Sequence, residues 1–170
     1  VDIESPTPDT SVTLSGVTKI YFDTNQFKNV EIVQNTNGSG ILYAGVSTLG
    51  NTTTRNKLTI NGITWVAGTI YGGDTRFEKG NSTGNEVIFQ NNGYVNGTVY
   101  GGWADNGDAT YNTITLNRIS PTAYAGTDLY GGASNRSGAD VVTGNTLRVL
   151  SKENYANGIF NFDRYEFVLG

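Results

Sequence analysis

The 170-residue sequence contains no cysteine, no histidine and no methionine. These absences exclude thiol nucleophiles, thiolate metal sites, histidine-based catalytic triads and the usual zinc ligand sets. Carboxylates, Tyr, Lys, Arg and hydroxyl groups are left for any chemistry. We therefore predict no metal site and no cofactor, and we do not expect an enzyme.

Charge and continuous hydrophobicity are also scarce. Charged residues make up 15% of the chain, and the net charge of −4 opposes binding to nucleic acid or to anionic membranes. No apolar run approaches the ~20 residues of a membrane span, so we expect no direct membrane insertion. The chain is instead rich in Gly (23), Thr (23) and Asn (20), a composition that favours turns and β structure over long helices.

A short pattern repeats along the chain: a small residue, an apolar residue, Tyr, Gly and Gly. It occupies residues 69–73, 98–102 and 128–132, and it returns in weaker form at 41–45 and 158–160. The aromatic residues therefore stand at positions 43, 71, 100, 130 and 160, with steps of 28 to 30 residues. A period this regular indicates stacked structural repeats.

A second set of strand-like segments begins with Asn at 56–60, 85–89, 112–116 and 145–149. Because alternate residues of a strand share a face, each initial Asn lies on the same inward face as the aliphatic residues that follow it. We predict that these side chains form a structural ladder through the layers: Asn56, Asn85, Asn112 and Asn145. Aromatic residues six positions before each repeat Tyr predict another column: Trp65, Tyr94 and Tyr124.

These periods predict an all-β fold, a right-handed parallel β-helix of about five coils with repeats of about 29 residues. Residues 1–10 form an extended lead-in, and residues 11–170 form a single domain. We place the repeats at about 41–70, 71–99, 100–129 and 130–159, with capping segments at 11–40 and 158–170.

The repeat pattern is Tyr-Gly-Gly, then a variable turn with Gly and Asp, and then Asn-x-aliphatic-x-aliphatic. This order of motifs resembles the passenger repeats of autotransporter adhesins of Gram-negative bacteria. The resemblance covers roughly residues 41–150, and the aromatic ending at 158–169 resembles the segment that closes such arrays. It implies type V secretion across the outer membrane and exposure at the cell surface. The sequence shows neither a signal peptide nor a translocator barrel, so the resemblance implies a passenger fragment.

The Tyr column is the first candidate contact surface. If the neighbouring aliphatic residues face the core, the column points outward, where its rings form either a self-stacking ladder or a platform for a partner. Trp103 follows Gly102 and has no obvious stacking partner, and Asp74 and Asp105 lie in the turns after the glycines. The candidate binding residues are therefore Tyr71, Tyr100, Tyr130, Trp103, Asp74 and Asp105.

We expect an adhesin that contacts a host-cell surface protein, a host glycan or a neighbouring bacterial cell. One alternative is a secreted β-helix that binds or cleaves glycans with turn residues, grouped as Asp74 with Arg76, Asp105 with Asp108, and Arg136 with Asp140. Another is a purely structural stalk. The longer segment Ser134–Gly144 is a second candidate contact region.

Overall fold

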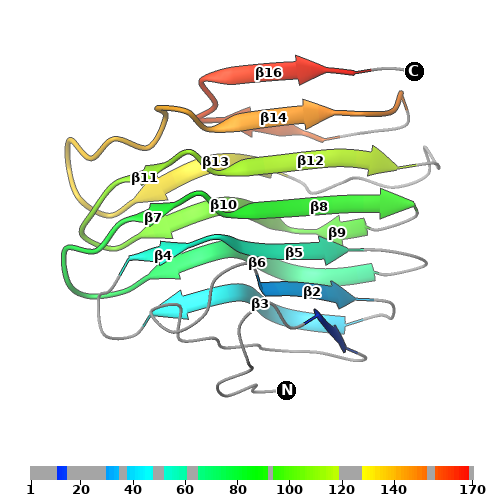
Figure 1. The fold of residues 1–170 in the computed structure, drawn as a ribbon, viewed down its shortest axis with the longest axis horizontal. Coiled ribbons are helices and arrows are strands. Elements are labelled where there is room, and N and C mark those ends of the chain that lie inside the picture. The colour runs from blue at the N-terminus through cyan, green and yellow to red at the C-terminus, as the bar shows by residue number, and fades with distance from the viewer. Residues whose placement is uncertain are drawn as a thin grey trace.

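The computed structural model of the chain describes residues 11–14, 30–34, 38–47, 52–60, 65–91, 94–118, 128–152 and 156–168. These residues form strands, turns and bends but no helix (Figure 1). Accordingly, no helix long and apolar enough to cross a membrane occurs among them. The all-β prediction is confirmed.

The strands build three parallel sheets. The first sheet has seven strands in the order β1-β2-β5-β8-β12-β14-β16. Its strands are Ser11–Leu14 (β1), Val30–Gln34 (β2), Asn56–Ile60 (β5), Glu86–Asn91 (β8), Thr113–Arg118 (β12), Thr146–Val149 (β14) and Arg164–Phe167 (β16). The second sheet has six strands. Five follow the order β15-β13-β10-β6-β3, and β9 also pairs with β6. Its strands are Gly38–Ser47 (β3), Trp65–Thr75 (β6), Tyr94–Asn96 (β9), Thr98–Ala104 (β10), Asp128–Ser134 (β13) and Gly158–Phe160 (β15). The three-stranded sheet, in the order β11-β7-β4, contains Thr53–Thr54 (β4), Ser82–Thr83 (β7) and Ala109–Thr110 (β11).

The chain visits the three sheets in turn, so each circuit is one coil of a parallel β-solenoid. Among the described residues, three coils hold a strand of every sheet: β3-β4-β5, β6-β7-β8 and β10-β11-β12. In Figure 1 these coils lie one above another, with β3 near one end of the stack and β16 at the other. The predicted class is confirmed, but the expected count of about five coils included two incomplete ones. The fourth lacks a third strand between β13 and β14, and the fifth consists of β15 and β16.

Strand alternation fills the interior with one stack of aliphatic side chains. In the six-stranded sheet Ile70, Val99 and Leu129 are in register and fully buried. In the seven-stranded sheet the residues at the same inward positions are buried as well: Leu58, Ile60, Val87, Phe89, Ile114, Leu116 and Leu147. Phe162 packs onto this core near the C-terminal end. The core is thus narrow, and each layer depends on the layers beside it.

A column of left-handed residues lies where the chain enters the seven-stranded sheet. Arg55, Gly84, Tyr111 and Gly144 have φ angles of 59°, 72°, 57° and 68°, and each directly precedes an Asn of the inward ladder. A residue in this conformation reverses the chain sharply, which is the corner the solenoid needs at this point. Two of these positions hold large side chains, so the corner is imposed by the stack and does not depend on glycine.

The asparagine ladder occupies the inner side of that corner. Asn56 Nδ2 donates to Asn85 Oδ1 at 3.0 Å, and Asn85 Nδ2 donates to Asn112 Oδ1 at 3.1 Å. The backbone N–H of Asn112 donates to Asn145 Oδ1 at 2.9 Å. All four side chains are buried. Buried amides require partners, and the stack supplies them from one layer to the next, except that Asn56 Oδ1 has none among the described residues.

The repeated Gly-Gly pairs make room for this ladder. A Cβ on Gly101 would lie 2.7 Å from the carbonyl oxygen of Gly131 in the next layer, and one on Gly102 would lie 2.5 Å from Asn112 Nδ2. Gly131 and Gly132 face their own neighbours in the same way. None of these four glycines has a φ between +20° and +160°, so no left-handed turn requires glycine at these positions. They are small because two backbones and a buried amide meet there.

Some sequence predictions fall on parts of the chain that the structure does not describe. The lead-in at residues 1–10 and Tyr124 lie outside the described residues. Trp65 and Tyr94 pair in register between β6 and β9, so their backbones occupy equivalent places in two layers. Both expected capping segments contribute strands to the sheets, through β1 and β2 at one end and β15 and β16 at the other.

Candidate functional site

The repeat aromatics form a continuous stack along the outer surface of the six-stranded sheet. Tyr71 stacks on Tyr43 and on Tyr100 with ring centroids 5.1 Å apart in both pairs. Tyr130 continues the stack 5.1 Å from Tyr100, and Phe160 follows 4.8 Å from Tyr130. We call these five residues the aromatic ladder. Tyr71, Tyr100 and Tyr130 are partly exposed, so the ladder stabilises the coils and also forms part of the surface.

The glycine pair also changes which side chains of β10 face outward. In a regular strand Tyr100 and Trp103, three positions apart, would point to opposite faces. Here Val99 and Ala104 are fully buried whereas Tyr100 and Trp103 are both partly exposed, so the glycines between them shift the alternation. The register aligns four different side chains in this column: Val46, Asp74, Trp103 and Ala133. Val46 and Asp74 are buried whereas Trp103 and Ala133 are partly exposed, so this position varies in burial as well as in identity.

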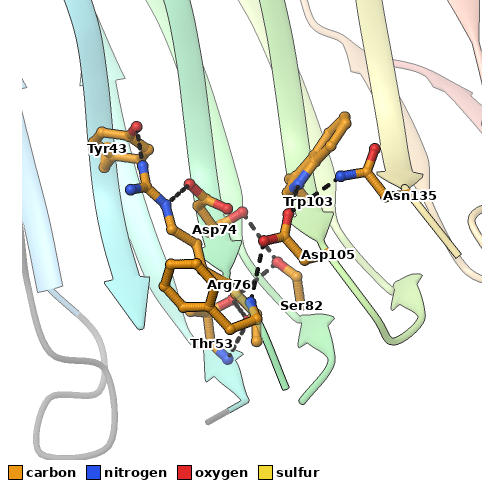
Figure 2. Close-up of polar contacts among 11 residues, drawn as sticks. Tyr43, Thr53, Asp74, Arg76, Ser82, Trp103, Asp105 and Asn135 are labelled. Carbon is orange, nitrogen blue, oxygen red and sulfur yellow. Dashed lines mark hydrogen bonds and ion pairs between the residues drawn. The ribbon is translucent and has the colours of Figure 1, made fainter. Parts of the chain in front are cut away.

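In the second coil, Arg76 connects a carboxylate to the aromatic ladder. Its Nε donates to Asp74 Oδ2 at 2.9 Å, its Nη2 donates to the Tyr43 hydroxyl, and its Cζ lies 5.1 Å from the centroid of the Tyr43 ring. Figure 2 shows the guanidinium of Arg76 between Tyr43 and Asp74. The interaction combines an ion pair with a cation–π contact.

Asp74 is covered, with only 4% of its surface exposed. Its Oδ1 atom is buried and has no hydrogen-bond partner within the described part of the chain. Burial raises the pKa of Asp74 to about 6, and the hydrogen bond from Arg76 opposes that rise. Burial also raises the pKa of Tyr43, Tyr71 and Tyr100. Asp74 therefore lies beneath the surface and contributes to the site by binding Arg76.

Trp103 has stacking partners, contrary to the expectation from sequence. Its ring lies edge-to-face with Tyr100 at 5.3 Å and with Tyr71 at 6.3 Å between centroids. Its indole Nε1 donates to Asp105 Oδ1 at 2.8 Å. Figure 2 shows the Asp105 carboxylate beside the indole nitrogen. The glycines that shift the strand alternation bring Trp103 against the ladder, an effect that spacing alone does not reveal.

Phe77 is the functional candidate that the sequence reasoning missed. It lies in the turn after β6 with 65% of its surface exposed, and its φ angle is 74°. Its backbone N–H donates to Asp105 Oδ2 at 3.1 Å, and its carbonyl accepts from Asn106 Nδ2 at 3.3 Å. The signal in the sequence was a bulky aromatic between Arg76 and Glu78, in a turn where polar residues are usual.

We call Asp74, Arg76, Phe77, Trp103 and Asp105 the turn cluster. It spans two neighbouring coils, because Asp105 accepts hydrogen bonds from groups on both. The cluster borders the aromatic ladder through Arg76 and Trp103. Together these residues provide aromatic surface, a partly exposed carboxylate and a fixed guanidinium on the outside of one part of the solenoid.

The other turn carboxylates form a separate group. Asp108 Oδ1 accepts from Arg136 Nη2 at 2.6 Å and from the backbone N–H of Asp140 at 2.9 Å. Asp140 Oδ1 accepts the N–H groups of Val142 and Thr143, and the hydrogen bonds from Thr143 lower the pKa of Asp140. These contacts order the segment Ser134–Gly144 against the previous coil. Among the residues that the structure describes, no group of three or more acidic side chains is placed to hold a metal ion.

Comparison with protein-family models, with curated proteins and with solved structures finds no match to this chain.

Proposed function

We propose that this chain is a passenger segment of an autotransporter adhesin that is displayed on the surface of a Gram-negative cell. The partner is a host-cell surface protein, a host glycan or a neighbouring bacterial cell. The observation that carries this proposal is the turn cluster, which departs from the repeat and holds Trp103 at the surface against Tyr100. A stacked solenoid provides the rigid support that such a contact surface needs.

The remaining support comes from the repeat itself. The Tyr-Gly-Gly and Asn motifs carry the resemblance to autotransporter passengers, and both have a physical role in the stack because each Gly-Gly pair accommodates an Asn amide. An open surface of this kind gives modest affinity per contact. Display of many copies on a cell raises the overall avidity by a factor of about 10² to 10⁴.

A cell-binding assay tests the proposal. The 170-residue chain is biotinylated and assembled on streptavidin, and its binding to epithelial cells and to bacterial cells is measured by flow cytometry. We expect saturable binding that falls about tenfold or more in Trp103→Ala, since truncation of an anchoring aromatic has effects of this size. The matched control is Tyr111→Gly, which removes another exposed aromatic away from the turn cluster.

The result that would overturn the proposal is an absence of binding by the folded, multimeric chain to any of these cells. Equal loss in Trp103→Ala and Tyr111→Gly would also contradict it, because the turn cluster would then have no special role. Thermal unfolding of each variant, followed by circular dichroism, shows that the variants compared are folded.

A structural stalk is the second candidate. The observation in its favour is that the candidate contact residues are also engaged within the chain: the ladder rings stack on each other, Trp103 binds Asp105 and Asp74 binds Arg76. Glycan cleavage has less support, because Asp108 forms its own ion pair with Arg136 and does not join Asp74 and Asp105. The stalk would be favoured by a stable multimer that binds no cell.

A further inference from the structure

Phe77 occupies an unfavourable position for a large side chain. Its φ of 74° lies in the left-handed region, which is unfavourable for a residue with a Cβ. Its ring gains little in return, because 65% of its surface is exposed. Hydrogen bonds of the Phe77 backbone to Asp105 and Asn106 hold this conformation, so the exposed ring is not needed to maintain it.

Asp105 fixes both Phe77 and Trp103. One carboxylate oxygen accepts the backbone N–H of Phe77 and the other accepts the indole N–H of Trp103. The two aromatic residues come from adjacent coils, β6 with its following turn and β10, and a single side chain joins them. Asn106 Nδ2 adds a second hydrogen bond between these coils at the Phe77 carbonyl. These hydrogen bonds therefore hold the backbone of Phe77 and the indole of Trp103 in place around Asp105.

The groups around these aromatics indicate the chemistry of the partner. Aromatic rings pack against the apolar faces of sugar rings, and Asp and Asn side chains exchange hydrogen bonds with hydroxyl groups. Asp105 and Asn106 supply such groups directly beside Phe77 and Trp103, and Asn135 Nδ2 lies 3.5 Å from Asp105 Oδ1. This combination of residues suits a ligand rich in hydroxyl groups.

The charges argue against an acidic ligand. Arg76 is paired with Asp74, and Arg136 is paired with Asp108. Both arginines of these turns are therefore already bound to a carboxylate. The Asp105 carboxylate instead accepts neutral N–H groups, so a negative charge remains at the centre of the cluster. A sialylated or sulfated glycan would be repelled by that charge.

We propose that Phe77 and Trp103, both held by Asp105, form a binding site for an uncharged glycan. The inference rests on the proposed adhesin function and names the ligand class of the same surface. Phe77 and Trp103 contact the sugar rings, and Asp105 is a positioning residue that also presents its carboxylate to hydroxyl groups. The site is open, so the affinity of one copy is low and multimeric presentation raises the apparent affinity on an array.

A glycan array tests this inference with defined probes. The streptavidin-bound chain is applied to printed uncharged oligosaccharides and to their sialylated and sulfated counterparts. The uncharged probe that gives the strongest signal is then titrated in solution, with intrinsic tryptophan fluorescence as the readout. We expect binding to uncharged probes, with sialylated and sulfated versions of the same probes at least about tenfold weaker.

Phe77→Gly is the decisive variant, because glycine adopts the same φ without strain and only the ring is lost. We expect it to weaken binding to the uncharged probe about tenfold or more. Tyr111→Gly is its matched control, since Tyr111 is also exposed, at 61%, and also has a positive φ of 57°. It is expected to bind as the unmodified chain does.

Asp105 needs a separate test of its positioning role. Asp105→Ala is expected to weaken glycan binding about as much as Phe77→Gly does, and Asp105→Asn to recover part of the affinity because it keeps one carbonyl acceptor. Circular dichroism at the assay temperature shows that both variants are folded. Equal affinity in Asp105→Ala and the unmodified chain would overturn the role of Asp105 and with it the inference.

Three array results would also overturn the inference: no glycan bound, binding only to acidic glycans, or full binding by Phe77→Gly. The cell-binding assay separates these results from failure of the adhesin function. A chain that binds cells through Trp103 but binds no glycan retains the adhesin proposal and points to a protein partner. A chain that binds neither loses both.

Discussion

The asparagine ladder and the column that follows the glycine pairs run through the same coils but differ in almost every property. The ladder repeats one residue at Asn56, Asn85, Asn112 and Asn145, all buried and hydrogen-bonded from layer to layer. The other column changes from Val46 to Asp74, Trp103 and Ala133 at equivalent places in the register. Where neighbouring layers need the same contact, the repeat keeps the residue. At the other position the residue varies from coil to coil, and it is buried as Val46 and Asp74 but partly exposed as Trp103 and Ala133.

Asn112→Ala tests the ladder side of this comparison and has the largest expected effect. Asn112 Oδ1 accepts from the backbone N–H and the Nδ2 of Asn85, and Asn112 Nδ2 donates to the carbonyl of Ser82. Removal of the amide takes these partners from the buried Asn85 backbone N–H and the Ser82 carbonyl, whereas Asn85 Nδ2 keeps its bonds to the Thr53 carbonyl and Ser82 Oγ. We expect a loss of about 3–4 kcal/mol in the free energy of unfolding, measured by urea denaturation.

Asn106→Ala is the control for Asn112→Ala, because Asn106 is exposed and donates a single bond of 3.3 Å to the Phe77 carbonyl. It is expected to cost less than about 1 kcal/mol. Similar losses in the two variants would show that burial within the ladder adds nothing.

Gly101→Ala tests the space that the ladder requires. The added Cβ would lie 2.7 Å from the Gly131 carbonyl oxygen and 3.0 Å from Asn112 Cβ. The layers must separate to admit it, so we expect a loss of about 2–3 kcal/mol, measured as a lower urea midpoint. Gly138→Ala is the control, since Gly138 has a φ of 78° and a Cβ added there would meet no atom of the described residues within 4 Å. It is expected to cost only about 1 kcal/mol, from backbone strain.

The sequence was sufficient for the fold because the repeated contacts are the ones that build it. Regular steps between the Tyr residues and between the Asn residues predicted the coil length, and strand alternation predicted the inward faces. The number of complete coils was overestimated because residues 134–144 lead from the six-stranded sheet to Asn145 without forming a strand of the three-stranded sheet. Their irregular path is held by Asp108, Arg136 and Asp140.

The candidate site was predicted only in part. Trp103, Asp74 and Asp105 were found because they follow the glycine pairs, but the contact of Trp103 with Tyr71 and Tyr100 depends on a local shift of the strand alternation. Phe77 was missed because its importance lies in a positive φ and in hydrogen bonds to another coil, and a single sequence records neither. Non-repeating residues are therefore where sequence reasoning is weakest.

Asp74→Asn sharpens the comparison through pH dependence. Burial raises the pKa of Asp74 to about 6, above its value in the unfolded chain, so the native state binds a proton more tightly there. Between about pH 4 and pH 6 this group makes the native state more stable as the pH falls, and the benefit is lost as the pH rises through 6. We expect the contribution to be about 1–2 kcal/mol between pH 7 and pH 4.5.

The measurement for Asp74 is the urea midpoint of both proteins from pH 4 to pH 7. Other carboxylates contribute equally to the two curves, so the difference between the curves isolates Asp74. We expect Asp74→Asn to lack the rise in stability toward low pH. If the urea midpoints of the two proteins changed with pH in parallel, the pKa of Asp74 in the native state would not be raised by its burial.

Phe77→Gly has the smallest expected effect on stability and separates the turn cluster from the asparagine ladder most clearly. Glycine relieves the left-handed strain but has more freedom to lose on folding, and these two contributions are similar in size and opposite in sign. The exposed ring adds little burial to offset its removal. We therefore expect the free energy of unfolding to change by less than about 0.5 kcal/mol, while binding falls. A loss above about 2 kcal/mol would place Phe77 with the residues that hold the coils together, and the repeat alone would then account for its position.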